Sequence, residues 1–147
     1  MKVILLLADF AQVLNGKLYI MGGGWSMTGP QPSLSAIALK IEVPWNQTNQ
    51  KHNLKLELID SDYRAVTVPT PVGNSPVVID GEFEVGRPAG LKAGIPIDVA
   101  MAFPIGPLPL EPGERFIWKL SIDGKTDDNW QVAFSTRSAP QQPSQPN

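Results

Sequence analysis

An alternation of apolar and polar side chains near the C-terminal end most constrains what this chain can fold into. Apolar side chains occupy every second position of residues 116–122, and Lys119 and Ser121 stand between them. A period of two predicts a strand with one buried face. Asp123-Gly124 marks a reversal, and the alternation resumes over residues 130–134. The two segments predict a β-hairpin, and its two tryptophans place the centre of the hydrophobic core here.

Length and composition predict one domain without long helices. The chain has 147 residues, with 15 prolines and 13 glycines spread along it. Prolines and glycines at this density favour short strands joined by turns. We expect a single domain over residues 1–137. The Pro- and Gln-rich residues 138–147 have the composition of a flexible tail.

The same alternation recurs along the chain and predicts an all-β fold. Asn15-Gly16 is a strong signal for a two-residue hairpin turn. The expected fold is an antiparallel β-sandwich, immunoglobulin-like or jelly-roll-like, of about eight or nine strands, with a closed barrel as the lesser alternative. The expected strands are residues 2–10, 17–21, 37–43, 54–58, 64–68, 77–85, 97–103, 116–122 and 130–134. The residues expected to share one core are Leu6, Leu39, Ile41, Leu56, Val99, Met101, Phe116, Trp118, Leu120, Val132 and Phe134.

Charge and hydropathy argue against several classes of protein. The net charge is −2 and Lys and Arg form no run, so we expect no nucleic-acid partner. There is no cysteine, which excludes disulfides and thiolate metal sites. The apolar run 3–8 is too short for a secretory signal and is expected to be a buried strand. No segment has the roughly 20 apolar residues of a membrane span, so no membrane partner is expected.

The polar residues offer little catalytic chemistry. The single histidine, His52, lies in a polar stretch and is expected to be a solvated loop residue. Two carboxylate pairs, at residues 60/62 and 127/128, lie in predicted turns, where Asp binds nearby backbone. The acidic stripe at residues 80, 82 and 84 is expected to be the solvent-exposed face of a strand. Alternatively, its charges could protect an edge strand against pairing with other sheets. We therefore expect no enzyme, no cofactor and no metal.

Apolar side chains in loops are the expected points of contact with a partner. Trp and Met are enriched where proteins meet, and Trp25 and Met27 lie in a segment without periodicity. Trp25 could instead fold back as a lid on the end of the sandwich. The full set of expected contact residues is Trp25, Met27, Trp45, Leu91, Gln141 and Gln142.

Four motifs resemble a small family of domains of unknown function from actinobacteria and their phages. They are LLLADFAQV at residues 5–13, GKLYIMGGGW at 16–25, GRPAGLKAG at 86–94 and PLPLEPGERFIWKLSIDG at 107–124. The motifs consist of turns and core strands, so the resemblance implies a shared fold and assigns no functional residue.

Two classes of function remain open on the sequence. The first is a non-enzymatic structural module that docks on other protein subunits, most specifically as a capsid decoration or tail-associated protein of a phage virion. The second is a carbohydrate- or small-ligand-binding sandwich in an actinobacterial cytoplasm. A homo-oligomer is compatible with both, and the phage version follows from the resemblance by analogy.

Overall fold

Eleven strands and one short 3-10 helix, η1 (Trp45–Gln47), make up the described part of the protein. The computed structural model describes residues 1–140, and this range contains no α-helix. The all-β prediction is therefore confirmed. Two strands more than expected are present, because β3 and β7 form where the alternation is too short to be visible in the sequence. Gln141 and Gln142 lie outside the described residues.

Two sheets contain nine of the eleven strands. Sheet A is four-stranded, with the order β2-β1-β4-β9, and sheet B is five-stranded, with the order β3-β11-β10-β5-β8. Sheet A consists of β1 (Lys2–Leu14), β2 (Lys17–Gly23), β4 (Ser35–Val43) and β9 (Ile97–Ile105). Sheet B consists of β3 (Met27–Thr28), β5 (His52–Asp60), β8 (Val78–Phe83), β10 (Arg115–Ile122) and β11 (Gln131–Thr136). The strands β6 (Thr67–Thr70) and β7 (Gly73–Pro76) form a separate ribbon.

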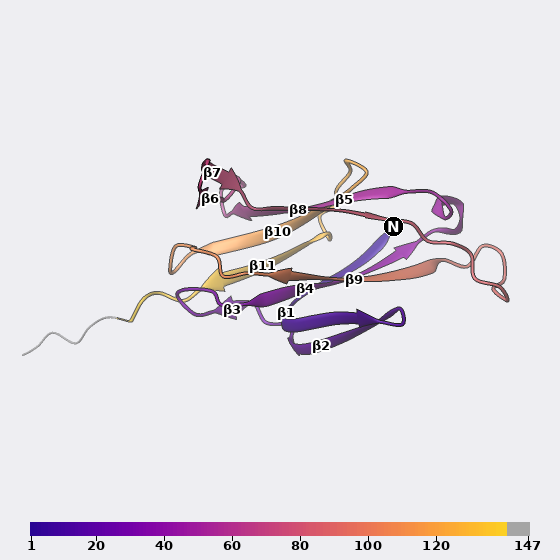
Figure 1. Cartoon of the computed structure of the whole chain (residues 1–147), viewed down its shortest axis with the longest axis horizontal. Helices are drawn as coiled ribbons and strands as arrows, with labels where there is room; N and C mark the ends of the chain where they lie inside the picture. The colour runs from indigo at the N-terminus through magenta and orange to yellow at the C-terminus, as the bar shows by residue number, and fades with distance from the viewer. Residues whose placement is uncertain (141–147) are drawn as a thin grey trace, which may run out of the picture.

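Pairing is antiparallel throughout sheet A, and sheet B is mixed because β3 runs parallel to β11. In Figure 1, β5, β8 and β10 of sheet B lie above β4 and β9 of sheet A. The inner faces of the two sheets contribute to a single hydrophobic cluster.

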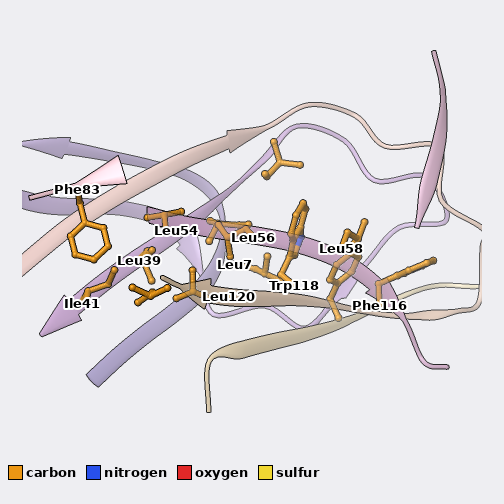
Figure 2. Close-up of a cluster of buried hydrophobic side chains, with 14 of the residues drawn as sticks. Leu7, Leu39, Ile41, Leu54, Leu56, Leu58, Phe83, Phe116, Trp118 and Leu120 are labelled. Carbon is orange, nitrogen blue, oxygen red and sulfur yellow. The ribbon is translucent and has the colours of Figure 1, made fainter. Parts of the chain in front are cut away.

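Alternate residues of the central strands build this cluster. Figure 2 shows Leu39 and Ile41 from β4 with Leu56, Trp118 and Leu120 from sheet B. Trp118 is only 2% exposed. The prediction of the core is confirmed for the buried members named above and for Phe116 and Phe134, which also belong to the cluster. Three other members of the expected set pack against it while half-buried, namely Val99, Met101 and Val132.

Leu6 was wrongly placed in the core. Leu7 is 1% exposed and belongs to the cluster, whereas Leu6 is half-buried and does not. The run 3–8 is apolar on both faces, so the sequence carried no alternation from which the inward parity could be chosen. The inward residues of β1 are the odd-numbered ones, which include Val3 and Leu5.

The long strand β1 changes partner along its length. Residues 2–8 pair with β4, and residues 8–14 pair with β2. The β1–β2 hairpin folds back beneath β4 and β9, on the side of sheet A away from sheet B (Figure 1). There Ala11, Gln12 and Val13 line a cavity together with residues 100–103 of β9.

Small side chains on the outer face of sheet A make room for this hairpin. Ala8, Ala36 and Ala38 lie on that face and are at most 3% exposed. Ala100 and Ala102 of β9 line the same cavity as the hairpin residues Ala11, Gln12 and Val13, and a methyl side chain lets a second backbone layer approach closely. The molecule therefore has a third, two-stranded layer that the sequence did not predict.

Candidate functional site

The β1–β2 hairpin is set up by its turn. Asn15 and Gly16 have φ values of 50° and 73°, the left-handed conformation that a two-residue hairpin turn of this kind requires. Leu14 pairs with Lys17 across the turn, and the ladder continues to the pair of Phe10 with Met21. Because side chains alternate across a strand, this register fixes which residues share each face of the ribbon.

One face of the hairpin is directed into solvent and is largely apolar. Phe10 is 50% exposed, Leu14 49%, Tyr19 53% and Met21 67%. The opposite face, with Ala11, Val13 and Leu18, is half-buried against sheet A. We call the four solvent-facing residues Phe10, Leu14, Tyr19 and Met21 the hairpin face. The only charged residue that shares this side of the ribbon in the paired stretch is Lys17.

The sequence contained the hairpin face without revealing it. The first strand was expected to end at about Phe10, with the next strand pairing to the residues before the turn. The first strand in fact continues to Leu14. The signal that could have revealed the face is the alternation of Phe10, Gln12 and Leu14, read together with the turn that follows them.

A cavity of about 470 Å³ lies at the base of the hairpin. Two of the expected contact residues, Trp25 and Met27, line it together. The remaining lining residues include Asp9, the three glycines 22–24, and Pro32, Ser33, Leu34 and Ser35. We call this cavity the base pocket.

Trp25 is half-buried and packs against the hydrophobic cluster. Its ring meets that of Phe134 edge-on, with the centroids 6.0 Å apart. Its indole nitrogen is buried and has no hydrogen-bond partner within residues 1–140. Met27, by contrast, is 55% exposed on β3. Trp25 thus lines the base pocket and also covers part of the core, whereas Met27 presents its side chain to solvent.

The other two expected contact residues lie elsewhere. Trp45 is in η1, which follows the opposite end of β4 from the base pocket. The Arg87 guanidinium lies 4.1 Å from the centre of the Trp45 ring and donates to the Trp45 carbonyl oxygen. Leu91 is 42% exposed in the loop between β8 and β9. The structure therefore brings Trp25 and Met27 together and separates them from Trp45.

His52 is not the solvated loop residue that we expected. It begins β5, is 3% exposed, and stacks on Phe83 with ring centroids 5.1 Å apart. Its Nδ1 lies 2.6 Å from Oδ2 of Asp123, and its Nε2 lies 2.7 Å from the carbonyl oxygen of Gln47. A polar sequence neighbourhood suggested exposure, but the side chain points inward at the first residue of a strand whose alternate members are buried.

Both imidazole nitrogens act as hydrogen-bond donors in this arrangement. A carbonyl oxygen and a carboxylate can only accept, so the geometry fits the imidazolium form. Burial lowers the pKa of His52, but the hydrogen bonds to Asp123 and Gln47 and the charge of Asp123 together outweigh burial and raise the pKa above its ordinary value. The hydrogen bond from His52 in turn lowers the pKa of Asp123, although the partial burial of Asp123 raises that pKa.

Asp123 also organises the backbone around it. Its Oδ1 accepts a hydrogen bond from the Asn53 N–H, and its own N–H donates to the Asn53 carbonyl oxygen. Asp123 holds the left-handed φ of 52° in the turn after β10. We call His52, Asp123 and Gln47 the histidine clamp. A base in a catalytic triad needs a free nitrogen facing its nucleophile, and here that nitrogen is engaged by Gln47.

One carboxylate of each predicted pair binds nearby backbone, as the sequence indicated. Oδ1 of Asp60 accepts hydrogen bonds from the backbone N–H groups of Asp62 and Arg64. Oδ1 of Asp127 accepts one from the N–H of Asn129. In residues 1–140, no group of three or more His, Cys, Asp or Glu side chains could hold a metal ion. That part of the chain also contains no helix long and apolar enough to cross a membrane.

The acidic stripe lies on a sheet edge. β8 is the last strand of sheet B, and Asp80 and Glu82 are exposed on it. Both interpretations of the stripe are therefore compatible with the structure. These carboxylates are exposed to solvent, and they also place negative charge on an edge strand.

Comparison with known proteins gives a family and nothing more specific. No curated protein and no solved structure matches the chain. Residues 3–134 match a family of unknown function, DUF6941, and this span includes the whole hairpin, the base pocket and the histidine clamp. Since the match covers most of the sequence, the chain belongs to the family of unknown function DUF6941.

Proposed function

We propose that the protein is a non-enzymatic docking module that binds other protein subunits through its hairpin face. The observation that carries this proposal is the row of four large apolar side chains, each about half exposed or more, on one side of a paired ribbon. Contiguous exposed apolar patches of this kind mark interaction sites in soluble proteins. Aromatic side chains and Met are also the residue types enriched in such sites.

The hairpin is a preorganised support for such a surface. Its turn conformation, its ladder and its seat on the alanines of sheet A all hold the four side chains in place. A surface that is already ordered loses little conformational freedom on binding, which favours affinity. Met27 and the 71%-exposed Leu34 extend the apolar surface toward the base pocket.

The histidine clamp supports the non-enzymatic side of the proposal. His52 is the one histidine of the chain, and both of its nitrogens are occupied. The rest of the molecule serves as scaffold, which we take to be an antiparallel β-sandwich of immunoglobulin-like or jelly-roll-like character.

The most specific version of the proposal is a capsid decoration or tail-associated protein of a phage virion. Its support is the resemblance of the four sequence motifs to a family shared by actinobacteria and their phages, which is an analogy. A host-encoded chain would act in the bacterial cytoplasm instead. Mass spectrometry of purified virions tests this version, and absence of the chain from complete particles would end it.

Charge substitutions on β1 test the docking proposal itself. Phe10→Lys and Leu14→Lys place a charge at opposite ends of the hairpin face, in both cases on β1 and without altering the edge of β2. Val72→Lys is a matched control, because Val72 is 94% exposed in the turn of the β6–β7 ribbon. We expect the wild-type chain and the control to retain the same partner from extracts of the source, and both hairpin variants to lose it. Equal retention by all four chains would refute the hairpin face as the docking site.

A second candidate function is favoured by the base pocket. Its volume of about 470 Å³ is in the range of small-ligand sites, and a tryptophan is one of its lining residues, as aromatic side chains often are in ligand pockets. Titration of a glycan panel followed by tryptophan fluorescence, with Trp25→Phe as the control, tests this alternative. Absence of any Trp25-dependent change across the panel would eliminate it.

A further inference from the structure

The exposed edges of the sheets are not equally protected against pairing with another strand. Unpaired edges usually carry Pro, charge or very short strands, because a bare edge can add a foreign strand. β8 carries Asp80 and Glu82, and β9 carries Asp98 and Pro104. β3 has only two residues, and β6 and β7 contain Pro69 and Pro76 respectively.

β2 is the least protected of the described edges, since its one charged residue, Lys17, is its first residue. It runs from Lys17 to Gly23, with the sequence KLYIMGG, and contains no proline and no acidic residue. It is the outermost strand of sheet A and pairs only with β1. Its side chains from Tyr19 to Met21 are exposed.

The register of the hairpin shows which peptide groups are free on this edge. Leu14 and Lys17 flank the two-residue turn and form the first hydrogen-bonded pair, so alternate residues of β2 bond to β1. The peptide groups of Leu18 and Ile20 therefore point away from β1. None of the backbone hydrogen bonds outside the ladders of residues 1–140 involves either residue.

We propose that β2 pairs antiparallel with β2 of a second copy, so that the two A sheets join into one continuous sheet. A two-fold axis at Tyr19 lets Leu18 of each copy exchange hydrogen bonds with Ile20 of the other. Regular pairing ends after Met21, because Gly22 has a φ of +61°.

The edge is chemically complementary to itself in this register. Lys17 is the only charge on β2, and the axis places it opposite Met21 of the second copy instead of opposite another lysine. The two Tyr19 rings meet across the axis, which is a favourable cross-strand pair. Pairing also places the two hairpin faces side by side, which doubles the apolar surface. This inference deepens the proposed function, because it names a second copy as one partner of the same hairpin.

Sedimentation velocity of the full chain over a concentration series, combined with amide hydrogen exchange at Leu18 and Ile20, tests the pairing. We expect a monomer–dimer equilibrium, with slow exchange of both amides in the dimer and fast exchange on dilution. A chain that stays monomeric over the series, or amide exchange that does not depend on concentration, would overturn the proposal.

Two variants test the register. Ile20→Pro removes an N–H that is directed to the free edge, and Tyr19→Lys puts like charges at the axis. We expect each to weaken dimerisation at least about tenfold. If circular dichroism shows that Ile20→Pro does not fold, Tyr19→Lys decides alone, since Tyr19 is 53% exposed.

The controls separate this inference from the proposed function. Tyr63→Lys makes the same change at a 67%-exposed tyrosine in the turn after β5 and is expected to leave dimerisation unchanged. If Tyr63→Lys weakened dimerisation as much as Tyr19→Lys, the proposal that the dimer forms through the β2 edge would be contradicted. Loss of partner capture by Phe10→Lys in a chain that is strictly monomeric would refute the dimer and leave the docking proposal standing. If Phe10→Lys still captures the partner and the chain forms the dimer, the docking proposal is refuted and the dimer stands.

Discussion

His52 and Asp123 are 71 residues apart in sequence, yet their side chains lie 2.6 Å apart and tie the start of β5 to the turn after β10. A hydrogen bond between an imidazolium and a carboxylate is stronger than one between neutral groups. The imidazolium is buried, so removal of its partner leaves a charge without compensation. The pair therefore stabilises the fold near one end of both strands.

Asp123→Asn is expected to lower the free energy of unfolding by about 1 kcal/mol. Hydrogen bonds to charged groups contribute about 1.5–3 kcal/mol, and the value here is smaller because the Asp123 side chain is 43% exposed. Asn tolerates the left-handed φ of this position, so the backbone is not the cause of the change. Urea unfolding at pH 6 measures the loss. Asp62→Asn is the control, and an equal loss in both variants would contradict a specific role for Asp123.

The stability of the protein is expected to decline above about pH 6.5. The pKa of His52 is raised in the folded state, so the folded chain holds a proton that the unfolded chain releases at its ordinary value near 6.5. This contribution is complete below that pH and is lost as the pH rises through the folded pKa. The lowered pKa of Asp123 acts in the opposite sense, and its contribution is lost as the pH falls below about 4.

Urea midpoints between pH 5 and pH 8.5 check this profile. We expect His52→Gln to be less stable than the wild type at pH 5.5 and to have a flatter profile above pH 6. If the wild type and His52→Gln show parallel profiles, another group is responsible for the pH dependence.

The sequence predicted the strands that alternate and missed what depends on distant partners. In residues 116–122 and 37–43 the large apolar side chains favour one parity, and both segments lie in buried strands of the core. The run 3–8 is apolar on both faces, and its outer side is fully covered at Ala8 while Ile4 is 51% exposed. That cover is a tertiary contact, and no local pattern reports it.

The candidate sites were harder to predict for a similar reason. Asp123-Gly124 was visible as a turn, and His52 as a residue of the polar loop before a strand, but nothing in their spacing joined them. The hairpin turn at Asn15 was also visible. The exposure of Phe10 and Tyr19 depends on which side of the ribbon meets sheet A, which only the three-dimensional arrangement determines.

Leu7→Ala and Leu6→Ala form a matched pair that tests the inward parity of β1. Leu7 is 1% exposed, and truncation of a buried leucine costs about 2–5 kcal/mol of stability. Leu6 lies half-buried on the outer face, so Leu6→Ala is expected to cost less than about 2 kcal/mol of stability. Urea unfolding of both variants measures the difference. Similar losses would show that the two faces of β1 are equally buried in solution.

Gly22→Ala is expected to destabilise the hairpin through a clash with Asp9. Gly22 has a φ of +61°, and a Cβ atom built on it would overlap the Asp9 carboxylate. A left-handed non-glycine residue already costs about 1 kcal/mol or more, and the clash adds to that. Gly24→Ala is the control, because Gly24 has a φ of +87° but no atom within 4 Å of the added group. We therefore expect a larger loss of stability for Gly22→Ala than for Gly24→Ala.

Removal of the Asp9 carboxylate separates the clash from the backbone strain. In a double-mutant cycle, Asp9→Ala is expected to recover the part of the Gly22→Ala loss that exceeds the Gly24→Ala loss. Contact between neighbouring residues produces coupling energies of about 0.5–3 kcal/mol in such cycles. These two residues lie between the pairs Ala8–Gly23 and Phe10–Met21, where β1 leaves β4 and enters the hairpin. Additive losses in the cycle would mean that Asp9 does not constrain this junction, and that the orientation of the hairpin face is set by its alanine seat alone.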